Sequence, residues 1–79
     1  MNETNIANPT NLIDGLLNEI ERNIELKANY IEVSKLPNTN CSFAIACLDH
    51  DIQTAKNAIS SNDIVFMLSA YNTLKGNEG

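Results

Sequence analysis

Between residues 41 and 59, apolar side chains recur at alternating intervals of four and three residues. This spacing follows one side of an α-helix, whereas a half-buried strand would show an apolar residue at every second position. The pattern continues for about five helical turns, so it predicts a helix over about 41–59 with one narrow side facing the core. The residues of this seam are Cys41, Ile45, Leu48, Ile52, Ala55 and Ile59.

Two other segments have the same periodicity and predict helices over about 11–33 and 63–75. Pro37 and the polar residues 38–40 interrupt the chain before the second helix. Asn62 is suited to the left-handed cap that ends the second helix, and Asp63 to the N-cap of the third. The predicted core residues of the first helix are Ile13, Leu16, Leu17, Ile20, Ile24 and Ile31. Those of the third helix are Ile64, Met67, Leu68, Tyr71 and Leu74.

Short connections make neighbouring helices antiparallel, so the predicted fold is an all-α, three-helix antiparallel bundle. The 79 residues provide one domain, predicted over 10–76, with tails at 1–9 and 77–79. A core this small is stabilised weakly without a disulfide, a metal or association. Cys41 and Cys47 lie about 9 Å apart along one predicted helix, too far for a disulfide. We therefore expect oligomerisation to complete the bundle, in a reducing, cytoplasmic setting.

Some apolar residues of the first helix lie off its main side. Leu26, Tyr30 and Val33 form a second strip, which either contacts both neighbouring helices or serves as a groove for a partner. Lys27 occupies a core-type position between Ile24 and Ile31. Its aliphatic stem either covers apolar surface while the ammonium reaches water, or places a cation in a pocket.

Three apolar residues are predicted to point away from the core. Val65 and Phe66 lie off the inner side of the third helix, and Phe43 lies off the seam of the second. Loops or the N-terminal tail are one way to cover them. The other interpretation is a surface for self-association or for a target protein, with Phe43 and Phe66 as anchors in one intersubunit contact.

The formal net charge of −5 is concentrated in the first helix and its tail, where residues 1–32 carry six acids and two bases. The five basic residues are scattered over all three helices, which disfavours nucleic-acid binding. No apolar run approaches the length of a membrane span. An acidic helix instead favours a basic surface on another protein as the partner. The carboxylates of this predicted face are Glu19, Glu21, Glu25 and Glu32, with Asp14.

The residues offer little for catalysis or metal binding. Cys47, His50 and Asp51 share one helical side, but a zinc site needs a fourth ligand that the sequence does not supply. A single histidine and three scattered glycines exclude the usual nucleophile and phosphate-binding motifs. We expect no enzyme activity, no cofactor and no metal site. Cys47 is interpreted, with Ala44 and Ala58, as a small residue at a close helix contact.

Residues 42–76 resemble a group of short, uncharacterised helical proteins of phages and bacteria. The resemblance is carried by D-I-x-x-A-x-x-A-I at Asp51–Ile59, by the cap at Asp63, and by A-Y-x-x-L-K-G at Ala70–Gly76. It covers under half of the chain and implies no catalytic or ligand residues.

These observations favour a non-catalytic binding protein, such as a phage-type accessory protein that blocks a host protein. Its predicted contact residues are Glu19, Glu21, Glu25, Glu32, Phe43, Val65 and Phe66. One alternative is an oligomer that sequesters a nucleotide signal, with Lys27, Tyr30 and Tyr71 as contacts. Another is a homo-oligomer with a purely structural role.

Overall fold

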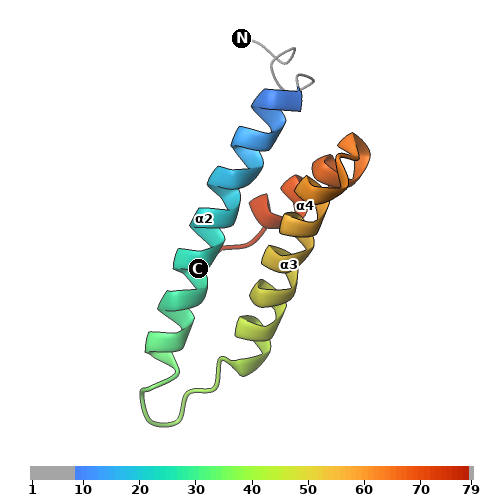
Figure 1. Ribbon diagram of the computed structural model, residues 1–79. Helices are drawn as coiled ribbons and strands as arrows, with labels where there is room; N and C mark the ends of the chain where they lie inside the picture. The colour runs from blue at the N-terminus through green and yellow to red at the C-terminus, as the bar shows by residue number, and fades with distance from the viewer. Residues whose placement is uncertain (1–8, 79) are drawn as a thin grey trace.

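The computed structural model describes residues 9–78, and over this range the chain folds into three helices. In chain order they are α2 (Pro9–Val33), α3 (Ser42–Ser61) and α4 (Ile64–Lys75). Each helix packs against the other two, and no strand occurs among the described residues. This arrangement confirms the predicted all-α three-helix bundle (Figure 1). None of these three helices is long and apolar enough to cross a membrane.

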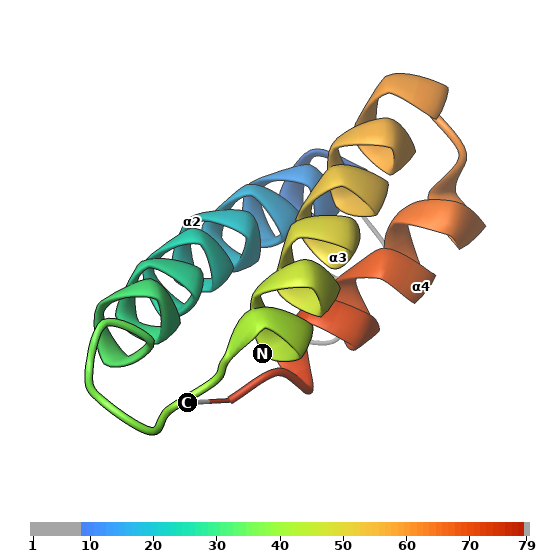
Figure 2. The same cartoon turned by 90° about the horizontal axis from the view of Figure 1, so that it is seen from below.

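α2 and α3 form an antiparallel hairpin, and α4 runs back along it (Figures 1 and 2). α4 has 12 residues against 25 in α2 and 20 in α3. Because it is short, α4 leaves part of the hairpin uncovered where α2 ends and α3 begins. The hairpin therefore has a long two-helix part and a shorter three-helix part.

The helix boundaries follow from local capping chemistry. α2 begins at Pro9, two residues before the predicted start. Proline is suited to the first turn of a helix, because it has no backbone N–H and the N–H groups of that turn have no partner within the helix. Asn40 Oδ1 accepts the backbone N–H of Ser42 at 3.0 Å at the start of α3. Between α3 and α4, Asn62 is left-handed with φ of 63°, as predicted. Asp63 accepts the N–H groups of Val65 and Phe66 at 3.0 and 3.3 Å, which confirms the predicted cap.

The core lies between α4 and one side of the hairpin. Its buried residues are Leu12, Leu16 and Ile20 of α2, Ile52, Ala55 and Ala58 of α3, and Met67, Ala70 and Leu74 of α4. Small alanines on α3 and α4 let these helices approach closely.

The prediction of which α2 residues face the core is partly wrong. Leu17, Ile24 and Ile31 were expected in the core but are 49%, 45% and 39% exposed. Leu16, next to Leu17, is fully buried. α4 therefore packs on the Leu16 side of α2, and the opposite side of the hairpin has no third helix. Ile64, at the start of α4, is also exposed rather than buried.

The predicted tails meet different outcomes. Residues 1–8 lie outside the described residues, and Pro9 belongs to α2. The predicted C-terminal tail includes Asn77 and Glu78, and both make contacts. Asn77 Nδ2 donates to Asn23 Oδ1 at 3.0 Å, and the Glu78 carbonyl accepts from the Tyr30 hydroxyl at 3.3 Å. The chain after α4 is therefore anchored to the hairpin.

Candidate functional site

The predicted acidic residues separate into two groups. Asp14, Glu21, Glu25 and Glu32 are exposed along the outer side of α2, and we call these four residues the carboxylate line. Glu19 lies on another side of the helix, half-buried, and accepts from Arg22 Nε at 2.9 Å. The structure therefore removes Glu19 from the predicted acidic face.

Little inside the chain neutralises the carboxylate line. Glu32 forms a salt bridge with Lys35 at 3.0 Å, and both side chains are well exposed. With the described residues, Asp14, Glu21 and Glu25 form no salt bridge. Charges held apart on a solvated helix face remain available to attract a basic partner.

The predicted aromatic anchors do not form one surface. Phe43 is 82% exposed at the start of α3, and Val65 is 75% exposed in the first turn of α4. Phe66 is half-buried and packs against the core, so it does not point into solvent as expected. α3 has 20 residues and spans about 30 Å between the two sites. Phe43 and Phe66 therefore cannot share a single contact patch on one chain.

Phe43 lines a small hollow beyond the end of α4. Tyr30 borders the same hollow of about 210 Å³, together with Cys47 and Asn77. Cys47 is exposed, so its interpretation as a small buried residue is wrong. The hollow exists because α4 is too short to cover this part of the hairpin.

The second strip on α2 is divided between core and surface. Leu26 is buried, Tyr30 is half-buried, and Val33 is 43% exposed. With Asn29 they line a shallow depression of about 270 Å³. α2 packs against both other helices, which accounts for its wide apolar surface.

A further opening with apolar lining lies on the side of the hairpin away from α4. We call this side the open face. It consists of Leu17, Ile24, Ala28 and Ile31 of α2 and Asp49, Gln53 and Lys56 of α3, and a groove of about 380 Å³ runs between the two helices.

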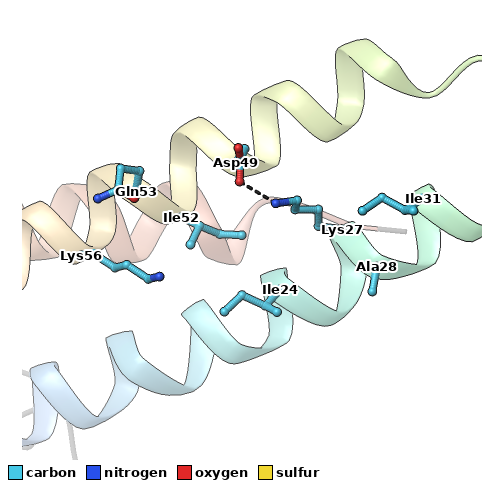
Figure 3. A pocket seen from close by; sticks show the side chains of 8 residues that line it. All are labelled: Ile24, Lys27, Ala28, Ile31, Asp49, Ile52, Gln53 and Lys56. Carbon is cyan, nitrogen blue, oxygen red and sulfur yellow. Dashed lines mark hydrogen bonds and ion pairs between the residues drawn. The ribbon is translucent and has the colours of Figure 1, made fainter.

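One ion pair bridges this groove. Lys27 Nζ contacts Asp49 Oδ1 at 2.6 Å, and Figure 3 shows the lysine reaching across from α2 to α3. The hydrogen bond and the charge of Lys27 lower the pKa of the Asp49 carboxyl below its ordinary value of 3.8. Lys27 is half-buried, so its stem covers apolar surface while its ammonium meets a carboxylate rather than water alone.

The alternative ligand residues are not brought together. Lys27 lies on the open face, whereas the Tyr30 hydroxyl meets the C-terminal segment at Glu78. The Tyr71 ring lies beside Gly15, about 22 Å along α2 from Tyr30. A single chain therefore does not assemble a pocket from these three residues.

The Cys47, His50 and Asp51 stretch also forms no site. In the described part of the chain, no group of three cysteine, histidine or acidic side chains is placed to hold a metal ion. Asp51 instead accepts a hydrogen bond from Asn77 Nδ2 at 3.1 Å.

A buried polar junction at Asn23 was also not predicted from the sequence. Asn23 has no exposed surface, and its Nδ2 donates to the carbonyls of Glu19 and Leu74 at 2.8 and 3.3 Å. Its Oδ1 accepts from Asn77. Asn77 also reaches Asp51, so residues of α2, of α3 and of the segment after α4 meet here. Asn23 follows Leu16 by seven residues, a spacing that places it on the buried side and could have indicated this role.

In comparisons with known protein families, with curated proteins and with solved structures, the chain matches none.

Proposed function

We propose that the protein is a non-catalytic module that binds a basic surface on another protein through its carboxylate line. The observation that carries this proposal is the exposure of Asp14, Glu21 and Glu25 without a salt-bridge partner among the described residues. Clustered charges of one sign accelerate encounter with an oppositely charged surface and select against like-charged partners. A helix also holds these side chains at fixed spacing, which limits the entropy lost on binding.

The finer proposal concerns the kind of partner. The resemblance of residues 42–76 to short phage and bacterial proteins supports a phage-type accessory protein that blocks a host protein. Phe43 and Val65 are exposed enough to add apolar contacts, but they lie away from the carboxylate line at opposite ends of α3. We therefore assign recognition to the carboxylates and not to a combined acidic and aromatic patch.

The experiment compares partner capture by two variants with the same change in net charge. Glu21→Gln with Glu25→Gln removes two charges from the carboxylate line. Asn57→Lys with Asn72→Lys adds two positive charges at exposed positions on α3 and α4. We expect capture from a host lysate to fall at least tenfold for the first variant and to change little for the second.

Raising the salt concentration should also weaken capture, because exposed charges are screened over about 10 Å at 0.1 M salt. Equal losses from the two variants would assign binding to net charge alone. Unchanged capture by the glutamine variant would contradict the proposal.

A further inference from the structure

We infer that the open face is where a second copy of this chain packs, antiparallel and related by a two-fold axis. The face holds an apolar stripe of Leu17, Ile24 and Ile31, spaced seven residues apart along α2. Seven residues are close to two helical turns, so the three side chains lie in one line. Each is between 39% and 49% exposed.

The ion pair across the groove gives the relative height of the two helices. Lys27 contacts Asp49, and α2 and α3 are antiparallel. Moving three residues back from Lys27 and three forward from Asp49 places Ile24 at the level of Ile52. Both residues line the groove (Figure 3). The middle of the apolar stripe is therefore level with the middle of the exposed side of α3.

A two-fold axis through this level makes the stripe self-complementary. Leu17 lies seven residues before Ile24, and Ile31 lies seven residues after it. Leu17 of one copy therefore meets Ile31 of the other. Ile24 then lies near the axis and packs on its own copy. The apolar residues of α2 would be covered along about four helical turns. A two-fold interface of this kind closes on itself and does not propagate into fibres.

The charges on α3 independently favour the same arrangement. Asp49 lies three residues before Ile52, and Lys56 lies four residues after it. In an antiparallel pair, Asp49 of each copy therefore lies within about one residue of the level of Lys56 in the other. Lys56 is exposed, and with the described residues it forms no salt bridge. A lysine side chain is long enough to span the remaining offset.

A two-fold axis parallel to the helices would not bring these charges together. Such an axis places α3 of one copy opposite α2 of the other, at the same height. Because Lys27 is level with Asp49 and the two helices are antiparallel, Lys56 would then lie opposite the level of Ile20. The pairing of Asp49 with Lys56 between copies therefore requires the antiparallel arrangement.

Association would bury apolar surface that the single chain leaves exposed. A bundle of this size has a small core, and its hairpin is covered by α4 on one side only. Packing two hairpins through their open faces creates a second apolar contact, made from α2 of both copies and flanked by the charged side of α3. The carboxylate line borders the open face, because Asp14 and Glu21 precede Ala28 at seven-residue intervals. The two proposals are nevertheless tested by different variants, since Ile24→Gln leaves all four carboxylates in place.

The first test measures association of the full chain by sedimentation, and we expect a concentration-dependent dimer. Ile24→Gln replaces the central apolar side chain with a good helix former, and it should weaken the dimer at least tenfold. Phe43→Gln is the matched control, because Phe43 is more exposed but lies off the open face. Circular dichroism of dilute samples checks that each variant is folded.

The second test uses charge exchange between two chains. Asp49→Lys and Lys56→Glu should each weaken the homodimer, since every interchain pair then has like charges. An equal mixture of the two variants should dimerise again, because the Asp49→Lys side chain of one copy then faces the Lys56→Glu side chain of the other. This recovery is specific to an interface in which these two positions meet, and it does not depend on Ile24.

Three results would overturn the inference. One is a wild-type chain that stays monomeric at about 1 mM. Another is a dimer that Ile24→Gln leaves intact or that Phe43→Gln disrupts instead. The third is a mixture of the two charge variants that associates no better than either variant alone. Sedimentation reports dimerisation and lysate capture reports partner binding, and Ile24→Gln keeps every carboxylate, so the two proposals fail separately.

Discussion

Leu16 and Leu17 are chemically identical neighbours on α2, yet Leu16 is fully buried and Leu17 is 49% exposed. The difference is set by α4, which covers the side of the hairpin that carries Leu16. On that side the chain also buries Asn23 in a hydrogen-bonded junction, whereas the open face has one ion pair over a shallow groove. The covered side of α2 is therefore expected to determine the stability of the monomer, and the open face to tolerate change.

The largest expected effect comes from truncating the two leucines in turn. Leu16→Ala removes a fully buried side chain and leaves a cavity, so we expect the free energy of unfolding to fall by about 2–5 kcal/mol. Leu17→Ala should lower it by less than about 1 kcal/mol in dilute protein. Chemical denaturation measures both values, and equal losses would show that the two sides of α2 are equally packed.

The polar junction should be the next most sensitive part of the covered side. Asn23→Ala removes the acceptor of Asn77 and one donor to the Leu74 carbonyl, and we expect a loss of about 1–3 kcal/mol. Arg22 also donates to that carbonyl at 2.7 Å, which limits the loss. Asn18→Ala is the control, since Asn18 is an exposed asparagine on the same helix. A similar urea midpoint for both variants would contradict a stabilising junction.

A smaller effect of opposite sign is expected at Gly15, which lies inside α2. Its backbone is helical, and a Cβ atom there would lie 3.4 Å from the Tyr71 ring, at van der Waals distance. Gly15→Ala should therefore raise the free energy of unfolding by about 0.5–1 kcal/mol through the lower backbone entropy of the unfolded chain. A lower melting temperature would instead mean that the Tyr71 ring cannot shift.

The ion pair on the open face should give the smallest effect. Lys27 lowers the pKa of Asp49, so the pair stabilises the folded chain above pH 3.8 and this contribution is lost as the pH falls through the folded-state pKa. At low protein concentration, neutral pH and low salt, the free energy of unfolding of Asp49→Asn should be slightly below that of the wild type. The difference should shrink as the pH falls below 3.8 towards the folded-state pKa, and it should also shrink in high salt. A gap that widens in acid would assign the effect to another group.

The sequence was sufficient to predict the three helices and the two caps between α3 and α4. The four-and-three spacing identified all three helices, and Asn62 and Asp63 marked the turn between α3 and α4 because each has a specific backbone role. Local rules of this kind depend on residues close in sequence. They therefore hold before the helices pack together.

The side of α2 that α4 covers was not predictable in the same way. Leu16 and Leu17 both satisfy helical periodicity, and α2 carries apolar residues around more than half of its circumference. Only the tertiary position of α4 decides between them. The predicted contact set failed for the same reason, since the orientation of α4 buries Phe66 against the core and the length of α3 separates it from Phe43.

The junction at Asn23 also has a kinetic consequence. Its contacts join residues far apart in the chain, since Asn77 follows Asn23 by 54 residues and Asp51 by 26 residues. Closing such long loops is slow compared with forming the α2–α3 hairpin, so we expect the junction to form after the folding transition state. Disrupting Asn23 should then accelerate unfolding far more than it slows folding. The same few hydrogen bonds would thus set how long the folded chain lasts between opening events.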